Sequence, residues 1–455
     1  MATTWNYPPG LSPLLRLTPL NVSDLPPHPD LAKSLPKVKD GEQSTQPDLL
    51  PFVTTLLNDG LAFLSKSEIA NHFKHTTTKK ADGSDADVDV LLQSISKSTI
   101  GSRVTWHNTN DAANRPSSRR ASATPSVSGK GKDTTTAPST SDQNHLAIPT
   151  NTQQPNSRSA SVSSTTAPTS RSRIQRPKPT SIADEHWYTR RSIHTSHSSK
   201  LSPGSAPEEF LFGLLNEHSK NEQAFTPNLF DAHPILNWDG QIRKLAEEGG
   251  LRREGWMDVS ASVWEMCHDL PGILGPRCFG VCVVGGRVVP EQGMAGPAAE
   301  GGGTSNDVST RPGTVSGLRR WERGEKQKFV VVTVPVVLEK VKASFYASYR
   351  NMKEGKDEKQ KRPVVQGLYA AVETCTLRAK TSAATATSDG AAAVAEEEEE
   401  VEWIMSTASD AKGNLPMWMQ KLALPGQLPK DVSYFMKWIR GVDEEDVEKA
   451  LAKFE

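Results

Sequence analysis

Apolar residues recur at helical spacing towards both ends of the chain. Near the start they predict an amphipathic helix over residues 49–64, followed by a short helix over 67–73. Near the end they predict a helix over 429–439, in which Val432, Phe435, Met436 and Ile439 form one apolar stripe. Asp431 would lie in the first turn of that helix and Lys437 in its last, which suits the helix dipole. An apolar stripe of this kind must be covered by another element, and a sheet is the expected cover.

Between these helices, β-branched and aromatic residues gather in short runs bounded by Gly, Pro or charge clusters, and these runs predict strands. In chain order the predicted strands are 185–195, 256–269, 278–289, 328–338, 344–352, 364–377 and 402–409. Further helices are predicted over 87–96, 207–219, 416–424 and 443–454. The last of them is expected to pack loosely, and a short strand is predicted over 103–106. The fold class is therefore α+β, with a curved antiparallel sheet closed by C-terminal helices.

Composition divides the chain into segments of different character. Residues 107–182 contain no Phe, Trp, Tyr or Cys and carry ten basic against three acidic residues, a net charge of +7. Such a segment cannot build a core, so a disordered linker is expected. The predicted domains are a flexible segment 1–48, a helical segment 49–106 that packs on the main domain, the linker 107–182, a folded domain 183–441 with flexible insertions 290–326 and 380–400, and a C-terminal helix 442–455.

Two serines in the linker have a basic context typical of phosphorylation sites. Ser122 follows Arg119 and Arg120, and Ser172 lies between Arg171 and Arg173. Short matches of this kind also arise by chance in Ser-rich linkers. Phosphate there would lower the positive charge of the linker and weaken its attraction to an anionic membrane or an acidic partner.

Overall composition excludes several classes of protein. Lys+Arg and Asp+Glu both number 53, so no global charge favours a nucleic acid partner. Mean hydropathy is −0.52, and no apolar run approaches the roughly 20 residues that a membrane helix requires. Four irregularly spaced cysteines do not form a disulfide scaffold and suit a reducing compartment. We expect a cytoplasmic protein, monomeric, with no nucleic acid partner.

No motif in the sequence predicts a metal, a cofactor or a catalytic centre. Cys278 and Cys282 share a strand face but would lie about 13 Å apart, too far for one zinc ion. The glycines at 301–303 lack the Lys-Ser/Thr ending of a phosphate loop. Neither a Gly-x-Ser-x-Gly nor a His-Glu-x-x-His pattern occurs. The prediction is a protein without cofactor, metal or enzymatic activity.

The most specific part of the sequence is a strand, a sharp turn and a helix between Trp403 and Ile439. The turn has the pattern Asp-x-x-Gly-x-Leu-Pro, from Asp410 to Pro416. This block resembles the end of START-type lipid-binding domains and, more closely, the fungal START-like family catalogued as domain of unknown function 3074. Further pieces agree with that family: Trp-Tyr-Thr-Arg-Arg-Ser-Ile-His at 187–194, Gly-Trp at 255–256, Glu-Met-Cys-His-Asp-Leu-Pro at 265–271 and Pro-Arg-Cys-Phe at 276–279.

The resemblance implies a helix-grip (Bet v 1-like) fold, in which a curved sheet wraps a long C-terminal helix around an apolar tunnel. The tunnel would hold one lipid or similar hydrophobic molecule, and the protein would touch membranes transiently. Alternation along the strands places polar groups among apolar ones, as pockets require. The candidate tunnel residues are Trp264, Met266, His268, Arg277, Trp403, Met405, Thr407, Phe435 and Met436.

Each candidate also has a plain structural interpretation. His268 could be a surface or satisfied core histidine, Arg277 could form a structural salt bridge, and Trp403 with Met405 could be ordinary core. Two other functions stay open as well. An enzyme on the same fold would need His268, Glu373 or Asp258 to converge inside the domain. An interaction scaffold would act through the linker and the acidic loop of five consecutive glutamates at 396–400.

Overall fold

The structure is a computed structural model that describes residues 11–32, 34, 46–84, 86–104, 106, 178–195, 206–270, 274–290, 327–380, 398–413 and 417–452. All of them belong to one compact unit, which combines Met1–His107 with Ser172–Glu455. The predicted linker lies outside the described residues except for 178–182, and Ser122 and Ser172 lie outside them too. The two predicted insertions are described only at their margins.

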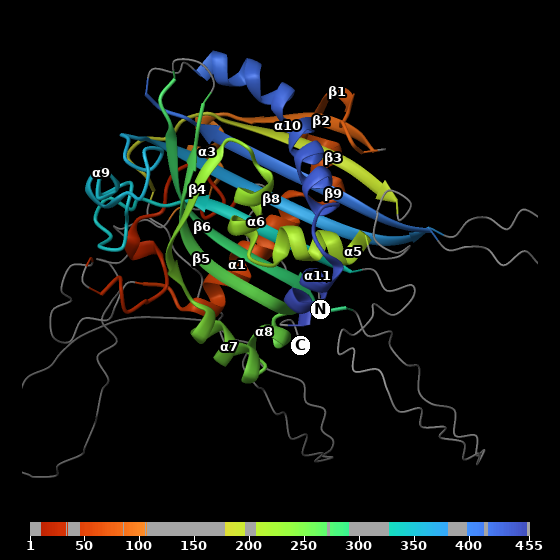
Figure 1. Cartoon of the computed structure of the whole chain (residues 1–455), viewed down its shortest axis with the longest axis horizontal. Coiled ribbons are helices and arrows are strands. Elements are labelled where there is room, and N and C mark those ends of the chain that lie inside the picture. Colours follow the sequence, from red (N-terminus) through yellow and green to blue (C-terminus); the bar gives the residue numbers. More distant parts are fainter. Residues whose placement is uncertain are drawn as a thin grey trace, which may run out of the picture. The chain divides into compact units, whose positions relative to one another are not determined.

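One antiparallel sheet of nine strands organises the described residues (Figure 1). The strands are β1 Lys74–Lys80, β2 Asp87–Ile95, β3 Glu185–Thr195, β4 Leu229–Asn237, β5 Trp256–His268, β6 Arg277–Val288, β7 Lys328–Pro335, β8 Val365–Lys380 and β9 Glu398–Asp410. Their order is β1-β2-β3-β9-β8-β7-β6-β5-β4, so the chain crosses from β3 to the far edge and returns strand by strand. A short parallel pairing of β6 with β8 completes the sheet. The α+β class and the large antiparallel sheet are confirmed.

Two elements at the β1 edge differ from the sequence prediction. Residues 87–95 form a strand, not a helix, and the burial of Val88 and Val90 alternates with exposure as a strand requires. Their partner β1 was not predicted, because it is a run of Lys, His and Thr that is exposed along nearly its whole length. Polar residues suit an edge strand, but they leave no period-two apolar signal. The short strand predicted over 103–106 is wrong as well: helix α3 spans Lys97–Arg103 and is capped by Ser96.

The opposite edge strand, β4, was also missed, because it contains Pro234. Proline cannot donate to a sheet ladder and argues against a central strand, but an edge strand tolerates it. The register of β4 against β5 shifts between Pro234 and Leu236, so the proline lies at an irregularity. Helix α7, Asp239–Glu247, and α8, Gly250–Arg253, connect β4 to β5.

Four helices and a π-helical turn cover one face of the sheet (Figure 1). They are α5 (Ala206–Phe210), the π-helical turn η3 (Leu211–Leu215), α6 (His218–Phe225), α10 (Met417–Ile439) and α11 (Glu444–Leu451). Helix α10 is one element with Pro425 and Pro429 inside it, where two helices were predicted. The apolar stripe predicted on it is confirmed: Val432, Phe435, Met436 and Ile439 are all buried. Helix α11 packs on the π-helical turn through Val447 and Leu451, so the prediction of loose packing is wrong.

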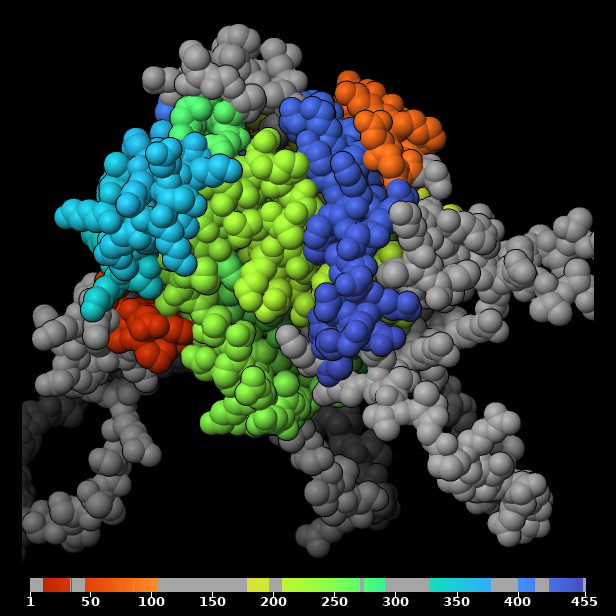
Figure 2. Space-filling view, viewed as in Figure 1, coloured from red at the N-terminus to blue at the C-terminus, as the bar shows by residue number. Residues whose placement is uncertain are grey.

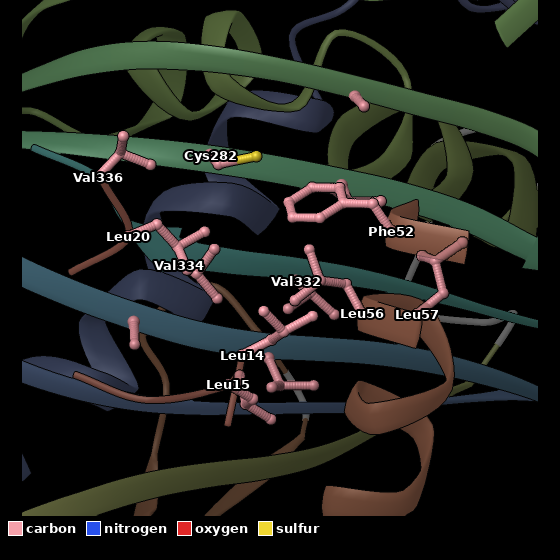
Figure 3. Close-up of a cluster of buried hydrophobic side chains, with 14 of the residues drawn as sticks. Leu14, Leu15, Leu20, Phe52, Leu56, Leu57, Cys282, Val332, Val334 and Val336 are labelled. Carbon is pink, nitrogen blue, oxygen red and sulfur yellow. The ribbon is translucent and has the colours of Figure 1, made fainter. Parts of the chain in front are cut away.

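The other face is covered by α1, Leu49–Phe63, with α2, Lys66–His72, following it, and by residues 11–31 (Figure 3). Gly60 allows α1 to approach closely, because a Cβ there would lie 2.6 Å from a methyl of Val332. Residues 11–31 were predicted as part of a flexible segment, yet Leu14, Leu15 and Leu20 are buried. The buried Arg16 guanidinium pairs with Glu185 at 3.1 Å and fixes this segment to the start of β3.

None of the described helices is long and apolar enough to cross a bilayer.

Replacing Phe435 by Asp tests whether α10 closes the fold. Phe435 is fully buried, so an aspartate there is an unpaired charge in an apolar interior and costs several kcal/mol. We expect loss of the cooperative thermal transition, measured by circular dichroism. Lys437→Glu, on the exposed side of the same helix, should melt like the wild type. A normal cooperative melt of Phe435→Asp would show that α10 does not close the fold.

Candidate ligand-binding site

Alternation along the strands gives the sheet face under α10 its own set of side chains. Trp264, Met266 and His268 alternate on β5, where Met266 is paired with Phe279 and Trp264 with Val281 of β6. The same cluster of apolar side chains includes Trp403 on β9 and the buried stripe of α10. Residues on the reverse face of these strands pack with α1 instead. The face under α10 is thus a separate compartment of the domain.

Phe435 is the centre of an aromatic layer that joins α10 to this face. Its ring lies 5.1 Å from that of Phe210, 5.6 Å from Phe225 and 5.0 Å from Trp403, measured between centroids. Gly213 in the π-helical turn makes room for it, because a Cβ at that position would lie 2.4 Å from the Phe435 ring. The layer packs α5, α6 and α10 together over the sheet.

A buried ion pair lies beneath this aromatic layer. Arg190 on β3 is 2% exposed, and its Nη2 lies 3.3 Å from Oε1 of Glu373 on β8. The Trp403 Nε1–H donates to the same carboxylate oxygen at 2.7 Å, and the Arg190 guanidinium lies 3.7 Å from the centre of the Trp403 ring. The same Nη2 is 3.2 Å from the Met405 sulfur. These contacts fix the arginine between β3, β8 and β9.

The ion pair leaves part of the arginine without hydrogen bonds. Nε and Nη1 of Arg190 have no partner among the described residues. A buried donor that is left unsatisfied costs about 1–3 kcal/mol, so native structures seldom tolerate one. Arg190 has two nitrogens of this kind, and a bound ligand that carries a hydrogen-bond acceptor would satisfy them.

Three further titratable groups approach the ion pair from the helices. His218 and Glu222 of α6 lie 3.9 Å apart, and the His218 Nδ1 lies 3.9 Å from Oε2 of Glu373. Burial raises the pKa of Glu222, and the interaction with His218 partly opposes this. Burial raises the pKa of Asp431 on α10 to about 7; Arg190 opposes this shift, and the negative charge of Glu222 adds to it.

Glu222 is desolvated and yet accessible. Its side chain is 24% exposed, although burial is the largest cause of its raised pKa. Asp431 and Tyr369 are likewise partly exposed while burial dominates the pKa shift of each. Each of the three side chains therefore keeps some accessible surface in surroundings crowded with protein atoms. Glu222 lies on α6, Asp431 on α10 and Tyr369 on β8.

Two histidines on this face, His268 and His194, are neutral at physiological pH. Burial lowers the pKa of His268 to about 4 and that of His194 to about 3. The His268 ring lies edge-to-face with Phe279 at 5.6 Å, and His194 Nε2 is 2.8 Å from the Ser192 hydroxyl. Neither ring supplies a charge to a ligand near pH 7. Among the described residues, no three His, Cys, Asp or Glu side chains group as metal ligands.

Residues 187–439 match the family described as "Protein of unknown function (DUF3074)". The match spans more than half of the chain. The chain belongs to the DUF3074 family. No curated protein matches it. Among solved structures, human STARD10 is similar at 11% sequence identity and a TM-score of 0.27, over 59% of this chain and 69% of that chain. A likeness of this extent supports no conclusion about function.

All nine candidate residues fall within the DUF3074 match, and eight of them lie on the sheet face under α10 or on α10 itself: Trp264, Met266, His268, Trp403, Met405, Thr407, Phe435 and Met436. Of these, Trp403, Phe435 and Met436 are at most 2% exposed, whereas Trp264, His268 and Met405 are partly exposed. The partly exposed residues are therefore the better candidates for contact with a ligand. Whether any of them binds one stays a prediction.

Arg277, the ninth candidate, contacts main-chain oxygens instead of a side-chain carboxylate. Its Nε donates to the carbonyl of Ala411 at 2.7 Å, and its other nitrogens donate to the carbonyls of Gly275 and Lys412. The guanidinium thus holds the start of β6 against the turn that follows β9. This arrangement favours a structural role over recognition of an anionic ligand.

Of the charged groups at this site, Glu373 was named only for the enzymatic alternative, and Arg190, Glu222 and Asp431 were not site candidates. Glu373 is the only charged residue in the predicted strand 364–377, and that isolation was a usable signal. Arg190 lies between Thr189 and Arg191 on β3, and the sequence cannot show that it faces Glu373. Asp431 was assigned to a first helical turn, whereas α10 begins at Met417 and places it well inside the helix. Glu222 lies in α6, whose polar sequence suggests a solvent-exposed helix.

Replacing Glu373 by Gln tests the buried ion pair. The change leaves Arg190 charged and unpaired in the interior, and breaking such a pair costs about 3 kcal/mol or more. We expect a loss of that size in the free energy of unfolding, measured with urea at neutral pH. Glu445→Gln, which removes an exposed i,i+4 pair with Lys449, is the matched control and should change little. A loss below about 1 kcal/mol for Glu373→Gln would contradict the desolvated pair and mean that water reaches it.

The raised pKa of Asp431 predicts a pH dependence. The folded state binds the proton of the Asp431 carboxyl more tightly than the unfolded state does. The stability that this proton contributes is therefore complete below pH 3.8, the ordinary pKa of the group, and is lost as the pH rises to about 7. In the wild type the free energy of unfolding should fall with pH in this range, by up to about 1.4 kcal/mol per unit relative to Asp431→Asn. Urea denaturation of both proteins across the range measures the difference. Parallel curves would contradict the prediction.

Proposed function

We propose that this DUF3074 domain binds, and transfers, one lipid or other hydrophobic molecule without catalysing a reaction. The binding place is an enclosed space between the sheet and α10, in a START-like, helix-grip arrangement. The observation that carries the proposal is the buried Arg190 guanidinium, whose Nε and Nη1 have no partner among the described residues. The partly exposed Met405 lies against it, and the partly exposed Glu222 lies on the helix above. Enclosed, mostly apolar spaces with a few convergent polar groups are typical of small-molecule sites.

The polar groups define one end of the proposed ligand. Arg190 offers Nε–H and Nη1–H as donors, and Asp431 and Glu222 offer carboxyl oxygens. A hydroxyl group can accept from the arginine and donate to a carboxyl at once. An ammonium group would instead neutralise the carboxylates. We therefore expect an amphiphile that ends in a hydroxyl or an ammonium group.

The apolar body of the ligand would lie along the sheet, away from the charges. Trp264 on β5 and Phe225 on α6 are partly exposed members of the apolar cluster under α10. Apolar surface moved from water to such surroundings contributes about 25 cal/mol per Å². A long acyl chain or a fused ring system would supply enough area to offset removal from a membrane.

The enzymatic alternative has less support. It needed His268, Glu373 or Asp258 to converge, but Asp258 pairs with Arg287 near the start of β5 and His268 ends that strand. Glu373 is held by Arg190 and Trp403. A role of the linker as an interaction scaffold, a cytoplasmic location, a monomeric state and the lack of a nucleic acid partner stay predictions.

Titration with a fluorescent long-chain alcohol and its amine analogue tests the proposal. Wild-type protein should bind at least one of them with saturable, one-to-one stoichiometry. Met405→Trp places a larger side chain beside Arg190 and should weaken binding at least about tenfold, while its thermal melt stays cooperative. Lys430→Trp adds the same side chain on the exposed side of α10 and should bind normally. Equal binding by both variants would place the ligand elsewhere.

A further inference from the structure

The connection between β7 and β8, residues 336–364, carries all the large apolar side chains that the described part of the molecule exposes. They are Val337 at 36%, Tyr349 at 63% and Met352 at 43% exposure. We call this connection the β7–β8 knob. In Figure 2 it forms much of the cyan surface at the edge of the face that carries α10 (blue). Tyr349 and Met352 are neighbours, because the Met352 N–H donates to the Tyr349 carbonyl at 3.3 Å. Neighbouring exposed apolar side chains mark an interaction site more often than scattered ones do.

The base of the knob is held by a buried carboxylate, which is why the strand predicted over 344–352 does not form. Glu265 on β5 is fully buried and ends among main-chain N–H groups of the knob. Its two oxygens accept four hydrogen bonds of 2.8–3.0 Å, from the Ser344 hydroxyl and the amides of Phe345, Tyr346 and Ala347. Hydrogen bonds to a charged acceptor are the strong ones, so the turn at 344–347 is well fixed.

Other, partly buried contacts hold the rest of the knob. The Tyr346 hydroxyl donates to Asp231 on β4 at 2.5 Å, and the Gln360 side chain donates to the same carboxylate at 3.0 Å. Asn351 is buried and donates to the carbonyls of Gln360 and Arg362. The knob is therefore a rigid projection with a short helix, α9 (Asn351–Glu354), near its tip.

Tyr349 adopts a conformation that its side chain does not favour. Its φ is +60°, in the left-handed region where glycine or asparagine is normally found. Its ring is mostly exposed and so gains little from packing in return. Strain of this kind persists where the surrounding structure imposes it, and it is concentrated at functional positions. The consequence is an aromatic ring held out into solvent by a fixed base.

The charge of the knob is positive although the whole chain is neutral. Residues 339–362 contain eight Lys and Arg against four Asp and Glu, a net charge of +4. One of the four acidic residues, Glu354, is paired with Arg350 at 2.6 Å. The six lysines are all exposed: Lys340, Lys342, Lys353, Lys356, Lys359 and Lys361.

We propose that the β7–β8 knob docks the protein on an anionic lipid bilayer. Tyr349 and Met352 enter the interfacial layer, where an aromatic ring is favoured, and the surrounding lysines bind lipid phosphates. A bilayer fits better than an acidic protein, because the exposed apolar side chains lie on a rigid basic projection, as insertion into a bilayer surface requires. This inference is independent of the ligand proposed above.

Docking in this way would place a defined end of the sheet at the membrane. Arg362 at the end of the knob pairs with Asp269, which directly follows β5, at 2.6 Å. The knob therefore lies beside the end of the sheet that carries His268 and the start of β6 at Arg277. The knob would hold this end against the bilayer.

Sedimentation of the full chain with vesicles tests the proposal. Wild-type protein should bind phosphatidylcholine vesicles that contain phosphatidylserine, bind vesicles of pure phosphatidylcholine at least about tenfold more weakly, and lose binding as salt rises. Tyr349→Gly removes the ring and also relieves the positive φ, so it should weaken binding while the melting temperature is kept or raised. This variant separates loss of docking from loss of fold.

Charge variants complete the test. Lys353→Glu combined with Lys356→Glu should weaken binding to the anionic vesicles at least about tenfold. Lys244→Glu, on the exposed surface of α7, should leave binding unchanged. Wild-type levels of binding in Tyr349→Gly and in the double lysine variant would overturn the proposal. Failure of the wild type to bind the anionic vesicles would overturn it too. If the protein then bound polyglutamate instead, the knob would be assigned to an acidic protein partner.

Discussion

The pairing of Arg190 with Glu373 in the interior is the interaction on which the rest of the domain depends. Both side chains project from central strands onto the face under α10, and both are almost completely buried. A charge in such a place is tolerated only when it is paired and its remaining hydrogen-bonding groups are satisfied. Trp403 donates to the glutamate and stacks on the arginine, and Phe435 brings α10 down over them. The two unsatisfied nitrogens of Arg190 make this compartment a candidate site as well as a core.

The sheet is covered on both faces, and this shapes its central strands. Strands β6 and β7 are buried along almost their whole length, because α10 and its neighbours lie on one side and α1 with residues 11–31 on the other. Their sequences are accordingly nearly continuous apolar runs without polar alternation, as expected for strands buried on both faces. A second buried ion pair, Arg16 with Glu185, fixes the N-terminal segment to β3, and the Trp187 Nε1–H donates to the same carboxylate at 3.0 Å.

The sequence predicted the parts of this structure that follow from local pattern. The apolar stripe of α10 and the strands β3 and β5 to β9 were found, because burial on a sheet or helix leaves a recognisable pattern of apolar residues. Strands β1 and β4 were missed, because edge strands tolerate lysine and proline. The knob was mistaken for a strand, since the Glu265 carboxylate that organises it lies far away in sequence. The candidates Trp264 and Met405 lie on the face under α10. The isolated charge of Glu373 in an apolar strand was a usable signal of a special position, but its pairing with Arg190 is tertiary and leaves no local signal.

The central claim is that the space under α10 holds one hydrophobic molecule. Native mass spectrometry of the protein purified from cells without detergent tests it most directly. We predict a species heavier than the bare chain by the mass of one amphiphile, which denaturing conditions remove and which Met405→Trp retains poorly. The bare chain alone, in the native spectrum and again after incubation with excess long-chain alcohol or amine, would contradict the claim.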